Sequence, residues 1–155
     1  MEFAKDFDPL PPDEMSRLME SADRYKQVEE SALDRVIAVG RAVDAGAVRF
    51  ELIALELRSA GAILYWKAYT DEPVFLGQPV VAMTDESGTE FDVFPASGGG
   101  GENVWSGQSN VSPRPKDGTS VRIEFGGFDE IDRHPQFKAL PPAIAGAHAV
   151  FQVAI

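Results

Sequence analysis

Residues 48–70 read VRFELIALELRSAGAILYWKAYT and carry the clearest structural pattern in the chain. Apolar and polar side chains alternate along both halves of this stretch, which is the period of a half-buried β-strand. A turn at residues 59–61, Ser-Ala-Gly, separates the two halves. We therefore predict two strands joined by a short turn.

The first of these strands changes phase. Val48 and Phe50 alternate in one phase, and the apolar residues from Ile53 onward alternate in the other. A one-residue slip turns every later side chain to the opposite face of a sheet. We therefore predict a β-bulge near Glu51 and Leu52.

The second strand has two distinct faces. One face carries Ala62, Leu64, Trp66 and Ala68. We expect it to pack in the core, since a buried tryptophan is common in β-sandwiches. The opposite face carries Ile63, Tyr65, Lys67 and Tyr69. Exposed tyrosines on a flat sheet can contact a protein or stack on a sugar; alternatively, another part of the chain covers this face.

Similar patterns continue to the end of the chain. Alternating segments occur at residues 35–43, 79–94, 102–111, 119–125 and 148–155, and the second contains a hairpin turn at residues 85–88. About eight short strands with no helix between them predict an antiparallel immunoglobulin-like β-sandwich. Residues 126–146 form the one long irregular connection.

Residues 12–31 form the one good helix candidate. Its apolar residues recur at three- and four-residue steps, and they are Met15, Leu18, Met19, Ala22 and Tyr25. The rest of the helix is charged, and a helix with so narrow an apolar stripe is marginal alone. We expect it to dock on its own domain, on a second copy of the chain or on a partner.

Three segments together resemble uncharacterised bacterial immunoglobulin-like β-sandwich domains. They are residues 36–68, TDESGTEF at 84–91 and DGTSVRIEF at 117–125. The resemblance covers about residues 35–125 and, more loosely, the last strand. It implies the fold, including a bulged second strand, and it brings no catalytic residues. The N-terminal helix lies outside it, so we divide the chain into an acidic segment at 1–34 and a sandwich domain at 35–155.

Charge and composition exclude several kinds of partner. The chain has 155 residues and a net charge of −11, of which residues 1–34 carry −6 (10 acidic, 4 basic). We expect no nucleic-acid or membrane partner, because both need a basic patch. A basic protein would suit this charge. With no cysteine, no long apolar run and an acidic start, the sequence predicts a cytoplasmic protein.

No motif predicts catalysis. Residues 98–101 are four glycines, but no Gly-Lys-Ser/Thr follows them and Glu102 stands where a phosphate would need a cation. We interpret them as a flexible hairpin connection. His134, beside acidic residues at 129–132, and His148 match no ligand spacing or catalytic triad. We expect no catalytic residue, metal or cofactor, and hence no enzyme.

The sequence therefore predicts a non-catalytic protein-interaction or assembly module, binding a partner protein or itself. The candidate binding residues are Met15, Leu18 and Met19 on the helix, Tyr65, Lys67 and Tyr69 on the strand, and Trp105 beside the glycines. The alternative is a module that binds a small ligand or carbohydrate through Tyr65, Tyr69 and Trp105.

Overall fold

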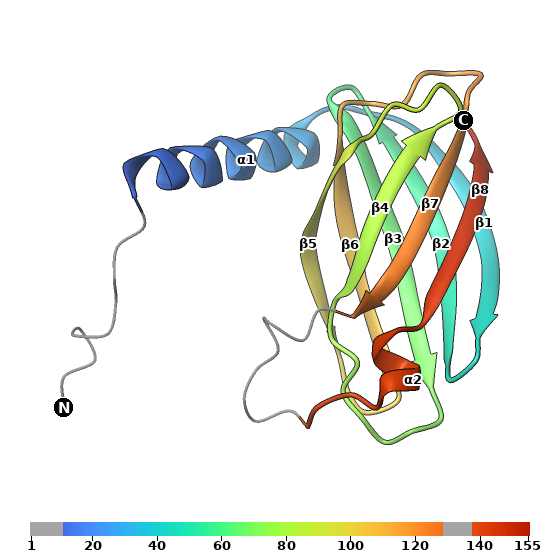
Figure 1. The fold of residues 1–155 in the computed structure, drawn as a ribbon. Helices are drawn as coiled ribbons and strands as arrows, with labels where there is room; N and C mark the ends of the chain where they lie inside the picture. The colour runs from blue at the N-terminus through green and yellow to red at the C-terminus, as the bar shows by residue number, and fades with distance from the viewer. Residues whose placement is uncertain (1–10, 129–137) are drawn as a thin grey trace.

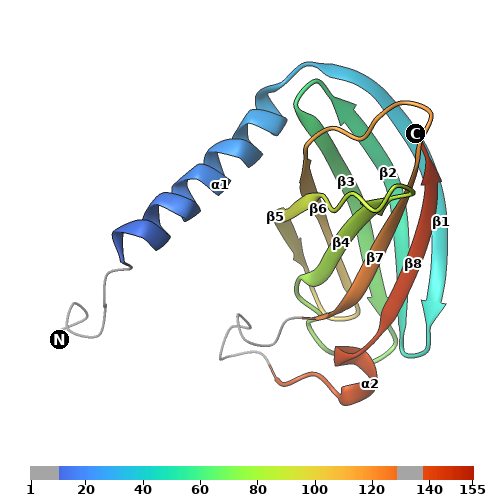
Figure 2. The same cartoon turned by 45° about the horizontal axis from the view of Figure 1, so that its top comes forward.

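A computed structural model describes residues 11–128 and 138–155 and shows an N-terminal helix beside two packed antiparallel sheets (Figure 1, Figure 2). The helix α1 spans Pro12–Glu30, and α2 is a single turn at Pro142–Ala145. The strands are β1 (Leu33–Ala45), β2 (Val48–Arg58), β3 (Gly61–Thr70), β4 (Pro79–Asp85), β5 (Asp92–Gly100), β6 (Val104–Ser112), β7 (Ser120–Phe128) and β8 (His148–Ala154).

The strand order is that of an immunoglobulin-like sandwich. One sheet has the order β1-β2-β3-β6-β5 and the other the order β4-β7-β8, with antiparallel neighbours throughout. Strands β2 to β8 thus take the ABED and CFG positions of a constant-type immunoglobulin domain. Strand β1 is an additional edge strand, which pairs with β2 in the larger sheet. The predicted all-β sandwich with an N-terminal helix is confirmed.

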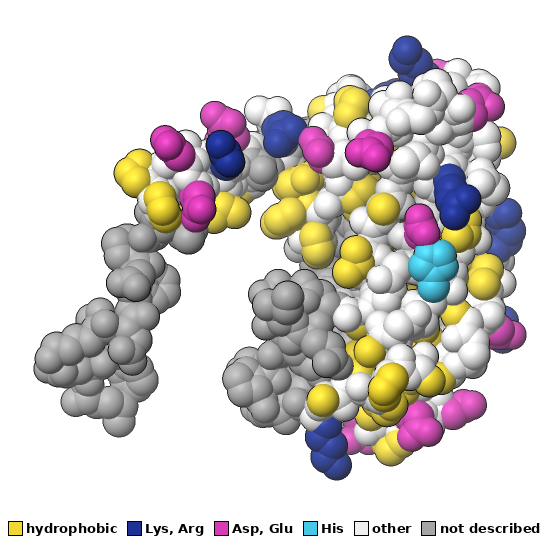
Figure 3. Space-filling view, viewed as in Figure 1, with side chains coloured by type: hydrophobic (Ala, Val, Ile, Leu, Met, Phe, Trp, Pro, Cys, Tyr) yellow, Lys and Arg dark blue, Asp and Glu magenta, His cyan; other side chains and the backbone are white. Residues whose placement is uncertain are grey.

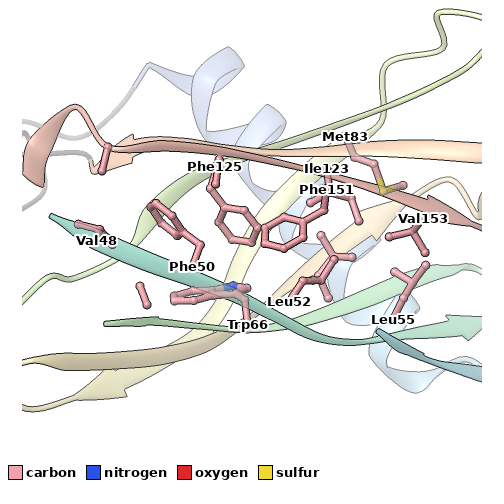
Figure 4. Packing of buried hydrophobic residues seen from close by; sticks show 14 of the residues in the cluster. Val48, Phe50, Leu52, Leu55, Trp66, Met83, Ile123, Phe125, Phe151 and Val153 are labelled. Atoms are coloured by element: carbon pink, nitrogen blue, oxygen red, sulfur yellow. The ribbon is translucent and has the colours of Figure 1, made fainter. Parts of the chain in front are cut away.

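The core lies between the two sheets, where aromatic and aliphatic side chains interdigitate (Figure 4). Phe50 and Phe125 stack across the two layers with ring centroids 5.3 Å apart. Trp66 is 1% exposed and meets Phe125 edge to face at 6.3 Å. Its indole Nε1 donates a hydrogen bond to Ser109 Oγ at 3.3 Å, so the buried polar group is satisfied. The predicted burial of Trp66 is confirmed.

Strand β2 contains the predicted bulge, slightly later than predicted. Its pairing with β3 shifts register between Leu52 and Ala54, which leaves Ile53 as the extra residue. Leu52 therefore still belongs to the first phase and lies opposite Trp66 in the core. Alternation alone assigns the apolar Ile53 to the same phase as Leu55 and Leu57, and it therefore predicts the slip one residue early, at residues 51 and 52.

The segment at residues 79–94 forms the predicted turn but not the predicted hairpin. Asp85 Oδ1 accepts hydrogen bonds from the backbone amides of Ser87 and Thr89 at 3.0 and 2.9 Å, and Gly88 has φ = 87°. Beyond one bridge between Thr84 and Glu90, however, β4 pairs with β7 and β5 with β6. The chain changes sheets here, which local turn chemistry does not reveal.

Three of the four consecutive glycines lie in a strand. Gly98 pairs opposite Gly107, and Gly100 pairs opposite Trp105, so the glycines extend β5 along β6. A Cβ atom at Gly100 would lie 2.2 Å from the carbonyl oxygen of Val104, a contact that only glycine avoids. The predicted hairpin is present, since β5 and β6 are antiparallel neighbours, but Gly98, Gly99 and Gly100 lie in its first strand and not in its loop.

The described ends of the 126–146 connection are ordered structure. Strand β7 continues to Phe128, and the α2 turn buries Ile144 in the core. The connection joins two neighbouring strands of one sheet, β7 and β8. Residues 129–137, with His134 and its acidic neighbours, lie outside the described residues.

Candidate interaction surface

Helix α1 contacts the sandwich through its last two turns. The ring of Tyr25 stacks on Phe94 of β5, with centroids 4.3 Å apart and planes 12° apart. Val28 is 1% exposed and lies against Gly61 at the start of β3. A Cβ atom at Gly61 would lie 2.7 Å from a Val28 methyl and 2.1 Å from the carbonyl oxygen of Val111. The glycine is therefore required for the helix to approach this closely. We call residues 24–30 the anchor.

Hydrogen bonds hold the anchor in one orientation. The Asn110 amide, buried on β6, donates to the Tyr25 carbonyl at 3.2 Å and to Glu29 Oε1 at 2.9 Å. Arg58 of β2 donates to the carbonyls of Glu29 and Ser31 at 3.0 and 2.7 Å. These carbonyls at the helix C-terminus have no partner within the helix, and the cation suits the negative end of its dipole. The anchor is thus capped by the sheet.

One ion pair and one shifted pKa also belong to the anchor. Arg24 Nη1 lies 2.9 Å from Asp92 Oδ2, with both side chains about half exposed. Burial raises the pKa of the Tyr25 phenol above 10.0, and the nearby Asp92 carboxylate raises it further. Asp92, the first residue of β5, therefore meets the anchor through Arg24.

The rest of the helix projects away from the sandwich (Figure 1, Figure 2). We call residues 12–23 the arm. Met15, Leu18 and Met19 are 43, 54 and 61% exposed, and Ala22 is exposed as well. These four residues, the stripe, continue along the helix into Tyr25 at three- and four-residue steps. The anchor half of one apolar face is thus covered by the sheet, and the arm half is left open.

Acidic side chains lie beside apolar ones on the surface of the arm, and they outnumber basic ones (Figure 3). It carries Asp13, Glu14, Glu20 and Asp23 against a single cation, Arg17. Within the described part of the chain, none of these four carboxylates forms an ion pair with a lysine or arginine. The arm therefore presents apolar side chains beside unpaired negative charge.

The second group of predicted residues lies on the outer face of the five-stranded sheet. The Tyr65 hydroxyl donates to Glu56 and the Tyr69 hydroxyl to Glu51, each at 3.1 Å, and Lys67 lies between them on β3. Partial burial, followed by the hydrogen bond to the carboxylate, raises the pKa of both tyrosines. All three side chains are half-buried. The hydroxyl groups of both tyrosines therefore already donate hydrogen bonds within the sheet.

Trp105 does not join this face. It pairs opposite Ala68, whose side chain is buried, and it packs against the core cluster at the end of the sandwich. Its neighbour on β6, Ser106, pairs with Lys67 on the outer face instead. The structure therefore separates Trp105 from Tyr65 and Tyr69 by the thickness of the sheet, and the three cannot form one binding surface.

Sequence reasoning missed three residues of the surface. Phe94 is 41% exposed and supports Tyr25, and Val28 and Asn110 fix the anchor. One signal was available for Phe94: beside the inward-facing Val93, it is an aromatic residue in the outward phase of a strand. Asn110 gave no signal, because its role depends on a helix 85 residues away in sequence.

Metal-binding groups and membrane-spanning helices can be assessed for the described residues. No group of three or more His, Asp or Glu side chains that could bind a metal ion occurs within residues 11–128 and 138–155. His148 Nε2 forms a hydrogen bond with a carboxylate oxygen of Glu124 on the outer side of the smaller sheet. Among the helices in these same ranges, none is long and apolar enough to span a membrane.

Comparisons of the chain with protein-family models, curated proteins and solved structures find no match.

Proposed function

We propose that this chain is a non-catalytic binding or assembly module in which the sandwich holds α1 as a docking arm for a partner protein. The observation that carries the proposal is the division of one apolar face. Its anchor half is buried against β3, β5 and β6, and its arm half, the stripe, is exposed.

The energetics favour a partner over solvent. A short isolated helix is only marginally stable in water, and the anchor fixes the last two turns of α1 from which the arm can propagate. Met15, Leu18 and Met19 are each about half exposed, so covering each would contribute about 1 kcal/mol of apolar burial. Because the anchor already fixes the end of the helix, binding of a partner loses less conformational entropy than ordering a free helix would.

Site-specific photocrosslinking tests the proposal. A photoreactive residue is introduced at Met19, on the stripe, and in a matched control at Glu20, on the other side of the helix. Both full-length proteins are exposed to lysate of the source cell, and crosslinked proteins are identified by mass spectrometry. The captured protein is then purified and titrated against the wild type and a Leu18→Ser, Met19→Ser variant.

We expect a protein that crosslinks from position 19 and not from position 20, and whose affinity falls more than tenfold in the double variant. Equal capture from both positions, or unchanged affinity in the variant, would contradict the proposed function.

A second candidate function is binding of a small polar ligand or carbohydrate on the outer face of the larger sheet. An open trough of about 530 Å³ lies there, between Tyr65 and Lys67 on β3 and Ser97, Ser106 and Gln108 on β5 and β6. A glycan array, followed by titration of hits against Lys67→Ala, tests it. Equal binding by the wild type and the variant would exclude this site.

A further inference from the structure

We infer that the partner of the arm is a basic amphipathic helix, with an apolar stripe flanked by lysine or arginine. This inference rests on the proposed function and identifies the chemistry of its partner. It depends on where the carboxylates of the arm lie relative to the stripe.

The two acidic residues nearest the stripe border it on opposite sides. At about 100° per residue in an α-helix, Glu14 and Asp23 each lie about a quarter turn from the centre of the stripe. Asp13 and Glu20 lie nearly opposite the stripe, as does the only cation of the arm, Arg17. Both borders of the apolar contact are therefore negative, and the compensating positive charge lies on the far side.

Charge complementarity decides between the occupants. A second copy of the chain would bring its own Glu14 and Asp23 against these borders and add like charges. The chain as a whole carries −11, so a second copy would also meet long-range repulsion. A partner helix with cations beside its apolar residues can pair with Glu14 and Asp23, and its positive charge is attracted to the chain at long range. We therefore assign a basic partner and not self-association.

The size of the surface sets the expected affinity. The stripe extends about 10 Å along the helix at 1.5 Å per residue. So short a stripe offers a smaller contact area than the roughly 800 Å² that each partner buries in a stable interface. Phe94 extends the apolar surface at the base of the arm, because it stacks on Tyr25 and remains 41% exposed. We expect a partner helix to bind with a dissociation constant on the order of micromolar.

The test uses a synthetic helical peptide of 18 residues as the probe, with leucines at three- and four-residue steps and lysines beside them. Two control peptides replace either the lysines with glutamates or the leucines with serines. Binding to the full-length protein is followed by fluorescence anisotropy at low and high salt. We expect only the first peptide to bind, with an affinity that falls as salt rises.

Two charge variants of the protein are matched to each other. Glu14→Gln with Asp23→Asn removes the border charges, and Asp13→Asn with Glu20→Gln removes two charges from the far side. Both change the net charge equally and alter one residue of the first helical turn. We expect about a fivefold loss of affinity for the basic peptide in the border variant, from two exposed ion pairs, and less than a twofold loss in the far-side variant.

Four outcomes overturn the inference: no binding of the basic peptide at millimolar concentration, equal binding of the acidic peptide, equal effects of the two charge variants, or dimerisation that depends on the stripe. If the protein captured by crosslinking still requires Leu18 and Met19 but neither charge pair, the proposed function stands and the basic partner does not. If it requires neither the stripe nor the charges, both fail.

Discussion

The two halves of α1 share one sequence pattern and have different surroundings. In the anchor, Tyr25 and Val28 are 9% and 1% exposed, and Asn110 and Arg58 bind the backbone at its end. In the arm, Met15 and Met19 are exposed. The difference is caused by the sheet, which offers Phe94 and the close approach at Gly61 to the anchor only. Apolar periodicity therefore identifies a face to be covered and does not say what covers it.

The largest expected effect comes from removing the platform on which both halves depend. Phe125 is fully buried and contacts the rings of Phe50, Trp66 and Phe151. Phe125→Ala should lower the free energy of unfolding by about 3–5 kcal/mol, through lost burial and the cavity left behind. Chemical denaturation measures this. A loss below about 1 kcal/mol would contradict the description of the core.

A pair of substitutions sharpens the contrast between the halves. Val28→Ala should lower the free energy of unfolding by about 2 kcal/mol, because Val28 fills the contact with Gly61. Leu18→Ala in the arm should change it by less than about 0.5 kcal/mol, because Leu18 is 54% exposed. Denaturation of both variants gives the comparison. Equal losses would mean that the arm also packs on its own domain.

The sequence predicted the sandwich well because that prediction rests on local alternation. Trp66, the bulge in β2 and the turn after Asp85 all follow from period and turn chemistry. It failed where contacts are distant in sequence: β5 joins a different sheet from β4, and Trp105 faces away from Tyr65.

The candidate surface was predicted only in part, for the same reason. The spacing of the stripe predicts it directly. Phe94 and Asn110, in contrast, contact Tyr25 from 69 and 85 residues further along the sequence.

Removing one polar contact of the anchor should have an intermediate effect. Asn110→Ala removes the side-chain donor to the Tyr25 carbonyl and to Glu29 Oε1, which we expect to cost about 1–2 kcal/mol of the free energy of unfolding. The helix signal in circular dichroism should then be lost at lower denaturant than the tryptophan fluorescence of the sandwich. Coincident loss at the wild-type midpoint would show that the bond does not hold the anchor.

The smallest expected effect is a pH dependence confined to the anchor. The pKa of Tyr25 is raised in the folded state, mainly by burial. Its contribution is therefore fully present below the unfolded pKa of 10.0 and is lost as pH rises through the higher folded pKa. Tyr25→Phe keeps the stacking ring and removes the titration, so the helix should lose less circular dichroism signal above pH 10 in this variant. Identical titrations would exclude the effect.

The central claim is that the stripe is exposed in the isolated chain and covered in the complex. Methyl-labelled methionine reports this directly, because Met15 and Met19 lie on the stripe and Met83, 2% exposed in the core, is an internal control. With a soluble paramagnetic probe, we predict strong broadening of Met15 and Met19 but not Met83, and protection of the first two when the captured partner is added. Protection of Met15 and Met19 in the isolated chain at every dilution would contradict the account.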